Sequence, residues 1–232
     1  MSVKDIARGI LFEKLSNVKE KGGVKFIIFD EESKEILDNY CTIQEAMKSC
    51  GAQFADKLLK KRQPQPDKDA LYFINGNNGE SIQQVNQDFK DSQNFHYKNI
   101  HFIFTCEFPP ERYSAFNRRL VDPHIKSRQE INIHFYKADE RVYHFNSPLN
   151  LLALLVGIEN QLCSQYMNKA ANQLKSLFVT LGDYPLLYYY KESIFSAKFA
   201  STFQLALETA RKAPKSTYPV YIFHFIFPFL FF

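Results

Sequence analysis

The sequence contains no tryptophan, few glycines and little excess charge, and each shortage excludes a class of protein. Eight glycines among 232 residues, together with 45% hydrophobic residues, exclude collagen and disordered or low-complexity chains. Lysine and arginine total 29 against 25 acidic residues, a net charge of only +4 that excludes a strongly basic nucleic-acid coat and an acidic tail. A chain of this length and apolar content can bury a sizeable core in one or two domains.

The four cysteines show no pattern typical of a disulfide framework or a zinc site. No two of them form a C-x-x-C pair, and no histidine follows them at zinc-finger spacing. The first residues, MSVKDIARGILFEKL, mix acids and bases where a signal peptide needs an apolar run. These features predict a reduced, cytosolic protein. The cysteines are Cys41, Cys50, Cys106 and Cys163.

Motifs for nucleotide or hydrolase chemistry are also absent. No glycine fingerprint follows the first apolar run, and neither G-x-x-x-x-G-K-[ST] nor G-x-S-x-G occurs. The acids of residues 30–32 could hold Mg²⁺, but no second acid cluster or phosphate binder accompanies them, which favours a solvated loop or a surface for a basic partner. The glycine-rich NGNNG of residues 75–79 lacks a lysine and predicts a polar turn. A doubly wound enzyme or nucleotide-binding protein with a degenerate site stays open as an alternative.

Short apolar runs alternate with helical patterns, which predicts βα units on a mostly parallel sheet. The first helix covers residues 4–21 and ends at Gly22-Gly23, because glycine tolerates the left-handed conformation at a helix end. Ser81 could cap another helix. The predicted strands are residues 24–30, 70–74, 101–105 and 130–135, and the predicted helices between them are 34–37, 43–50, 54–62, 81–89, 110–120 and 123–129.

The predicted helix 54–62 ends in Lys57, Lys60, Lys61 and Arg62, and two interpretations stay open for these cations. They could complement the helix dipole, or they could form a charged surface that faces a partner.

A second unit begins near residue 136, and the pattern predicts too few strands to complete it. Residues 141–145 and 186–190 read as extended, and residues 149–181 and 194–211 as helical. The sequence therefore predicts an α/β domain over 1–135, an incomplete second α/β domain over 136–216 and an unusual tail.

The tail, residues 217–232, reads TYPVYIFHFIFPFLFF and admits three interpretations. A membrane anchor needs a run of about 20 apolar residues, and His224 and Pro228 interrupt this shorter one. A buried strand suits Phe and Ile, although Pro228 argues against a central position. The third interpretation is translation of a pyrimidine-rich intron end, which would make the tail non-native. A membrane-tethered protein that uses this tail is a further alternative.

Read in order, several segments resemble the amino-terminal part of the SM (Sec/Munc) syntaxin-binding proteins, most nearly their exocytic branch. The similarity runs from about residue 5 to about residue 213, and family members are well over twice as long, so the resemblance implies a truncated chain. The segments are VKFIIFD, KLLKKRQPQP with ALYFI, DFKD, HFIFT, EINIHF with RVYHF, and LGDYPLLYY.

This resemblance implies a binding protein rather than an enzyme, without a cofactor. Its first domain would be a five-stranded parallel sheet flanked by helices. Its partners would be a syntaxin-type SNARE and assembling SNARE bundles, with no nucleic acid, so that it regulates vesicle fusion in exocytosis. Contact with the plasma membrane would be indirect, through syntaxin.

The resemblance also assigns two sets of contact residues. A cavity wall for closed syntaxin falls on Asp30, Glu31, Lys34, Thr42, Asp56, Lys60, Lys61, Arg62 and Gln63. An outer pocket for the amino-terminal peptide of syntaxin falls on Phe108, Tyr113, Ile125 and Glu130. Family members commonly carry a lysine in place of Thr42, an acid in place of Gln63 and a phenylalanine in place of Tyr113. Without the resemblance, Phe108 and Ile125 would read as core residues and Glu130 as a surface acid.

Overall fold

The computed structural model describes residues 3–90, 95–108, 110–139, 142–144, 161–182, 184–190, 192–210 and 222–225. The chain divides into two compact units, Met1–Ile133 and His134–Phe232, and each is described by itself. The predicted tail contributes β9 (Ile222–Phe225) to the second unit, and its other residues lie outside the described ones.

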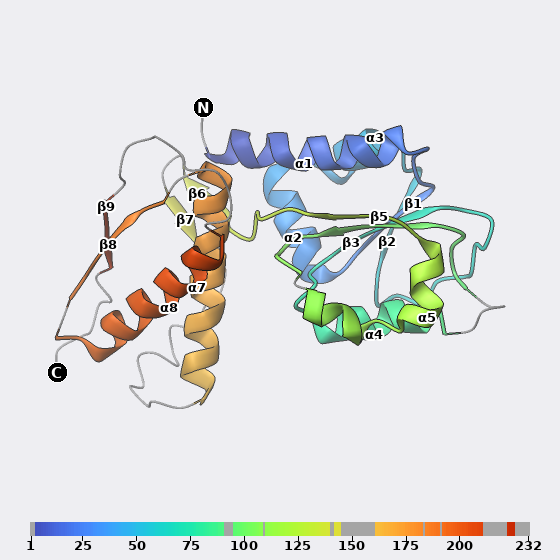
Figure 1. The fold of residues 1–232 in the computed structure, drawn as a ribbon. Coiled ribbons are helices and arrows are strands. Elements are labelled where there is room, and N and C mark those ends of the chain that lie inside the picture. Colours follow the sequence, from blue (N-terminus) through green and yellow to red (C-terminus); the bar gives the residue numbers. More distant parts are fainter. Residues whose placement is uncertain are drawn as a thin grey trace. The chain divides into compact units, whose positions relative to one another are not determined.

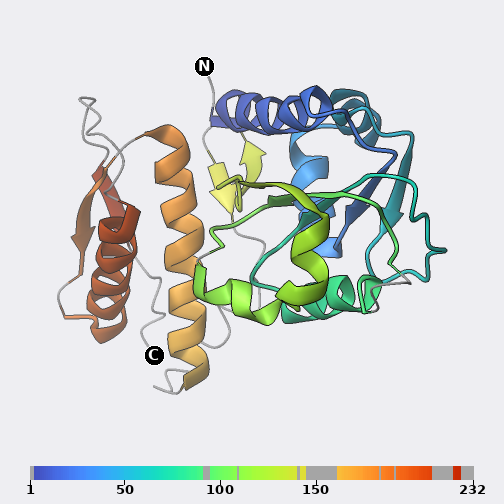
Figure 2. The same ribbon diagram turned by 45° about the vertical axis from the view of Figure 1, so that its right-hand side comes forward.

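The first unit contains a five-stranded sheet in which every pairing is parallel (Figures 1 and 2). The strand order is β2-β1-β3-β4-β5, which places the first strand of the chain inside the sheet rather than at its edge. This confirms the predicted α/β class with a parallel sheet flanked by helices. The strands are β1 (Phe26–Phe29), β2 (Phe54–Lys57), β3 (Ala70–Ile74), β4 (Ile100–Phe104) and β5 (Ile125–Glu130).

Helices cover both faces of this sheet. Figures 1 and 2 show α1 (Val3–Glu20) and α3 (Ile43–Cys50) on one face and α4 (Gly79–Asp88) on the other. The predicted helix 4–21 is confirmed, and its buried stripe of Ala7, Leu11, Leu15 and Val18 has the spacing of one helix face. The remaining elements are α2 (Glu31–Tyr40), η1 (Pro110–Ala115), α5 (Arg118–Val121) and η2 (Asp122–His124).

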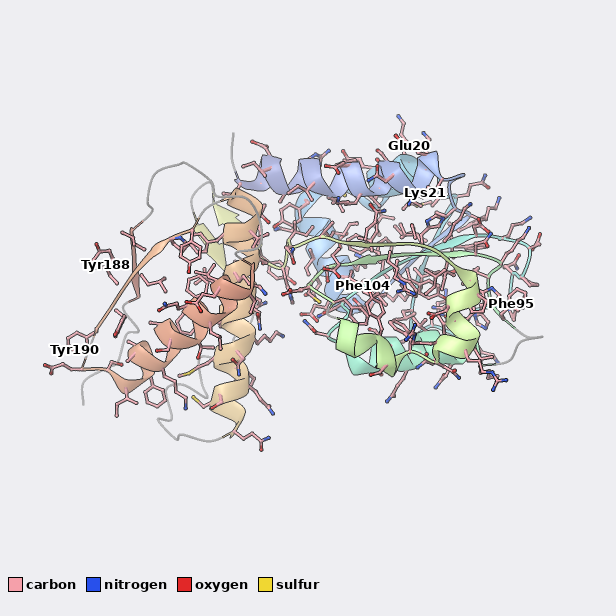
Figure 3. The ribbon with its side chains drawn as sticks, in the orientation of Figure 1. Glu20, Lys21, Phe95, Phe104, Tyr188 and Tyr190 are labelled. Carbon is pink, nitrogen blue, oxygen red and sulfur yellow. The ribbon has the colours of Figure 1, made fainter. Side chains whose placement is uncertain are left out.

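The central strands are buried on both faces, as expected of a parallel sheet covered by helices. Every residue of β3 and β4 is buried. Side chains alternate along a strand, so Tyr72, Phe102 and Phe104 join the cluster on the α4 face. Phe104 also stacks on Phe108, with 4.3 Å between the ring centroids, and Figure 3 shows it among densely packed side chains.

The predicted helix 54–62 is wrong. Residues 54–57 form β2, an edge strand paired with β1, and a turn follows it. Phe54 stacks on Phe26 at 5.4 Å, and this cross-strand contact holds the segment extended. A short polar segment at a sheet edge carries little periodicity of its own, so tertiary pairing decides its structure. The dipole interpretation of Lys57–Arg62 fails with the helix.

The last strand of the sheet lies earlier than predicted. Residues 125–130 form β5, where the sequence predicted a helix over 123–129. Of the predicted strand 130–135, only Glu130 lies in a strand, as the last residue of β5. The predicted helix over 110–120 is instead a 3₁₀ segment, η1, and a single turn, α5. The polar segment IKSRQE was missed because an edge strand buries few side chains: only Ser127 is fully buried.

The described residues of the second unit form two helices and two short sheets. α7 (Gln161–Leu181) packs on α8 (Ile194–Ala210), where the rings of Phe178 and Phe203 lie 5.8 Å apart. β6 (Tyr136–Asp139) and β7 (Val142–His144) are antiparallel, whereas β8 (Leu186–Tyr189) pairs in parallel with β9. No helix in the described parts of the chain is both long and apolar enough to cross a membrane.

Candidate functional site

The carboxyl ends of β1 and β2 carry a cluster of opposite charges, which we call the charged wall. It comprises Glu31, Asp56, Lys57 and Lys60. Of these four, Lys57 was not among the predicted cavity-wall residues. The parallel register sets Lys57 beside Phe29. The ammonium of Lys57 lies 2.9 Å from the carboxylate of Glu31 at the start of α2. Lys60 lies 3.9 Å from Asp56 across the turn. Exposed pairs of this kind add little stability, so their charges are available to a partner.

Other predicted wall residues extend this surface or lie away from it. Lys34 pairs with Asp38 one turn further along α2. Lys61 and Gln63 are exposed on the turn after β2. Thr42 lies beyond the opposite end of α2, and a helix of ten residues spans about 15 Å. The structure therefore does not bring Thr42 together with the charged wall.

Thr42 has a local structural role instead. It caps α3, and Glu45 completes a capping box by accepting a hydrogen bond from the Thr42 amide at 2.8 Å. Arg8 of α1 adds an ion pair at 2.7 Å. The backbone hydrogen bond from Thr42 and then the Arg8 guanidinium lower the pKa of Glu45 to about 2.

Asp30 is buried, so its side chain holds the fold together rather than facing solvent. One carboxylate oxygen caps α2 by accepting from the amide of Ser33 at 2.8 Å. The other accepts from the amide of Asn75 at 2.7 Å and from the hydroxyl of Ser81 at 2.9 Å. Ser81 thus bonds Asp30 rather than capping α4, and the N-cap of that helix is Asn78. Among the described residues no group of three or more metal-ligating side chains is placed to hold a metal ion.

Arg62 is also turned inward, with its side chain 3% exposed. Its guanidinium pairs with Asp88 at the end of α4 and donates to the carbonyl of Lys57 at 2.8 Å. Asp88 also accepts from the hydroxyl of Tyr72 at 2.7 Å, and burial together with this carboxylate raises the Tyr72 pKa well above its ordinary value. Arg62 therefore fixes the turn that carries the charged wall.

The predicted peptide pocket is brought together only in part. Phe108 is buried and meets the partly buried ring of Tyr113 edge-on at 4.7 Å, so it packs beneath Tyr113. Glu130 lies at the carboxyl end of β5, beside Phe104 in register. Ile125 lies at the other end of the same strand, about 16 Å away at the usual rise per residue.

Arg128, which was not among the predicted pocket residues, also lies in this region. Its guanidinium lies 4.6 Å from the ring centroid of Tyr113 and 3.2 Å from the carboxylate of Asp122. Arg128 is two residues before Glu130, so the two side chains share a face of β5. The period-2 pattern of a strand could have identified it, had the strand been placed correctly. We call Phe108, Tyr113, Arg128 and Glu130 the aromatic socket.

Known proteins with related names are similar to this chain in sequence. The chain is 26% identical over 197 residues to the protein transport protein sec1 of Dictyostelium discoideum, a match covering 85% of this chain and 32% of that protein. It is 22% identical over 205 residues to the SNARE-interacting protein KEULE of Arabidopsis thaliana, covering 86% and 30%. The chain thus spans about a third of the length of these relatives.

Solved structures show the same fold. The Unc18–syntaxin 1 complex from Monosiga brevicollis contains a chain that matches with a TM-score of 0.75 and 21% identity, over 91% of this chain and 37% of that one. The SM protein Vps45 in complex with the Qa SNARE Tlg2 matches with a TM-score of 0.75 and 12% identity, over 97% and 39%. The model of the Sec1 family matches residues 25–222, most of the sequence. The chain therefore belongs to the Sec1 family.

Proposed function

We propose that this chain binds a syntaxin-type SNARE and thereby regulates vesicle docking and fusion at the plasma membrane. The supporting observation is the Sec1-family match over residues 25–222 on a chain whose first unit exposes the charged wall and, in the aromatic socket, Arg128 and Glu130. Two of the structural neighbours are SM proteins solved with a syntaxin or a Qa SNARE. The activity would be binding without catalysis, the chain would be cytoplasmic, and membrane contact would be indirect, through syntaxin.

The charged wall suits a closed helical bundle that presents charges of both signs. Glu31, Lys57 and Lys60 are exposed, so each can exchange its present ion pair for one with the partner. Pairs of this kind contribute more to orientation and association rate than to affinity. Asp30 and Arg62 would act on the partner only by positioning their neighbours, because both side chains are buried.

The aromatic socket suits an extended peptide with one apolar and one basic side chain. The edge-on pair of Phe108 and Tyr113 offers an apolar contact, and aromatic side chains of this kind dominate binding energies. Glu130 would pair with the basic residue of the peptide, as charge-assisted hydrogen bonds are the stronger ones. A neighbouring solved structure, Sly1p with an amino-terminal peptide of Sed5p, has a TM-score of 0.72 and 15% identity.

An enzyme is the less favoured alternative. Ligands of doubly wound sheets bind beyond the carboxyl ends of the strands. At those ends Asp30 uses both carboxylate oxygens to bond Ser33, Asn75 and Ser81, so this carboxylate is not available to a substrate or a metal.

Calorimetric titration of the chain with the cytoplasmic part of a plasma-membrane syntaxin, with and without its amino-terminal peptide, tests the proposal. Tyr113→Ala and Glu130→Lys should each weaken binding roughly tenfold or more, as expected for an interface anchor, and only when the peptide is present. Lys57→Glu with Lys60→Glu should weaken binding in both cases. Lys48→Glu, a charge reversal at an exposed lysine of α3, is the control. A folded chain that binds no syntaxin, or variants that bind like the control, would contradict the proposal.

A further inference from the structure

A hollow of about 690 Å³ opens at the amino ends of the strands, at the opposite end of the sheet from the charged wall. Its walls carry five lysines and two aspartates. Four parallel strands each supply one lysine within two residues of their first residue, and the last turn of α1 supplies the fifth. The lining lysines are Lys19 from α1, Lys25 before β1, Lys68 before β3, Lys98 before β4 and Lys126 in β5.

The parallel topology creates this arrangement. Amino ends of parallel strands meet at one edge, so lysines that are far apart in sequence come together there. In Figure 1 the end of α1 and the start of β5 lie at the same end of the sheet, and Figure 3 labels Glu20 and Lys21 at that end of α1. We call this hollow the lysine basin.

The acids in the basin do not balance its lysines. Asp67 pairs with Lys68 at 2.6 Å, and Asp69 lies 3.5 Å from Lys126. Within the described residues, Lys19, Lys25 and Lys98 have no carboxylate partner among the ion pairs, which leaves a net charge of +3 on the basin walls. Lys25 instead donates to the amide oxygen of Gln53.

The positive field reaches the buried His101 of β4. Its Nδ1 lies 2.6 Å from the hydroxyl of Ser127, and its Nε2 is buried without a hydrogen-bond partner in the described structure. Burial and then the Lys126 charge lower the His101 pKa to about 4, so the imidazole is neutral at pH 7. The charge at this edge therefore comes from the lysines alone.

The partial negative charge at the carboxyl end of a helix can explain a nearby lysine, but it does not explain all five lysines of the basin. Carbonyls at the end of α1 already accept hydrogen bonds from the amides of Gly22 and Gly23. Only Lys19 lies in the last turn of a helix, whereas the other four lysines belong to strands or to the turns before them. Gly22 and Gly23 have positive φ and carry no side chain that would fill the basin.

We propose that the lysine basin binds a compact polyphosphate anion, one that carries at least two phosphomonoester groups. Its volume lies in the range of small-molecule sites and suits a group of headgroup size better than an extended polymer. Lysine binds phosphate as a flexible point charge, and the net charge of +3 on the basin walls can neutralise several phosphate oxygens. Such groups occur on free inositol phosphates and on phosphoinositide headgroups.

Two probes distinguish these sources. Titration of the full chain with soluble inositol trisphosphate tests the free anion. Flotation with phosphatidylcholine vesicles, with or without phosphatidylinositol bisphosphate, tests the headgroup in a membrane. Binding to both probes, or to either alone, supports the basin and identifies the source. No binding to either at low salt overturns the proposal.

Charge reversals locate the site. Lys98→Glu and Lys25→Glu should each weaken binding roughly tenfold or more, because each replaces an attraction by a repulsion at short range. The matched control is Lys4→Glu, at the other end of α1 from Lys19 and about 22 Å away along the helix axis. Equal losses in the control and the basin variants would overturn the proposal. Lys98→Gln, which removes the charge without adding repulsion, should give a smaller loss and serves if the Glu variants unfold.

This inference does not depend on syntaxin binding. The basin lies at the amino ends of the strands, whereas the charged wall and Glu130 lie at their carboxyl ends, so the basin variants should bind syntaxin normally. Loss of anion binding with intact syntaxin binding, or the reverse, would therefore identify which proposal fails.

Discussion

The carboxylate of Asp88 and the guanidinium of Arg62 form an ion pair in which the Asp88 side chain is only 1% exposed and the Arg62 side chain 3%. The pair joins the end of α4 to the turn that follows β2. That turn carries Lys60 and Lys61, so a buried contact determines where an exposed, charged segment lies. A stability defect and a binding defect can therefore arise from the same residue.

Arg62→Met should destabilise the first unit by about 3 kcal/mol, because removal of one partner leaves a buried charge uncompensated. Lys61→Met, an exposed neighbour, should change stability by no more than about 0.5 kcal/mol. Urea unfolding followed by circular dichroism measures both, since the chain has no tryptophan. Equal effects of the two substitutions would show that the ion pair is unimportant.

Asp30→Asn should lower the free energy of unfolding by about 2–4 kcal/mol. The amide group of the variant would face three donors that now bond one carboxylate. Glu31→Gln changes the adjacent, exposed carboxylate in the same way and should be nearly neutral. The same unfolding assay compares them. A neutral Asp30→Asn would mean that the hydrogen bonds of Asp30 are not needed to hold the loops at the ends of β1 and β3.

Gly76→Ala should displace Phe108 and disturb the aromatic socket. A Cβ at Gly76 would lie 2.4 Å from Cδ2 of Phe108 and 3.1 Å from Cδ1 of Phe104, both in buried rings. Overpacking of this kind costs about 1–3 kcal/mol. Gly79→Ala is the matched control, since nothing lies within 4 Å of its Cβ position. Thermal melting should separate the two, and similar melting temperatures would argue against tight packing at Gly76.

Stability should fall between pH 6.5 and pH 4 in a way that depends on His101. Its folded-state pKa is about 4 and its ordinary value is 6.5, so the unfolded chain binds the extra proton in this range. The contribution of neutral His101 to the free energy of unfolding is fully present above pH 6.5 and is lost as the pH falls toward 4. At 1.36 kcal/mol per pKa unit it amounts to about 3 kcal/mol.

The check is the pH dependence of unfolding in His101→Gln, which should be flatter than in the native chain over this range. His124→Gln removes a half-buried imidazole from η2 and is the control. A native-like pH dependence in His101→Gln would contradict the assignment.

The interior of the fold was predictable because apolar runs report burial. The strand 70–74 was predicted with its observed bounds, since all five of its residues are buried. Edge strands gave no such signal. Phe54–Lys57 is largely exposed, and Ile125–Glu130 buries only Ser127 fully, so only their pairing with β1 and β4 makes them strands.

The site was less predictable than the fold, since the sequence gives a residue's position but not its direction. Asp30 and Arg62 look like surface charges in a polar stretch, yet both point inward to buried partners. Lys57 was named among the cations that could face a partner, but the resemblance did not place it on the cavity wall. The lysine basin could not be predicted for a different reason. Its lysines are separated in the sequence by turns and helices, and only the parallel order of the strands brings them together.

The strand order also dictates when this unit can fold. Every pairing is parallel, so no two neighbouring strands can close through a tight turn, and each contact waits for an intervening segment. β1 is the first strand to be made, yet it needs β2 on one side and β3 on the other. During synthesis its apolar FIIF sequence therefore cannot be paired on both edges until both have emerged, and the outer edge of the sheet forms only when β5 arrives, near the end of the unit at Ile133. Such non-local assembly is slow and leaves a hydrophobic strand exposed on the ribosome, where a chaperone would have the most to protect.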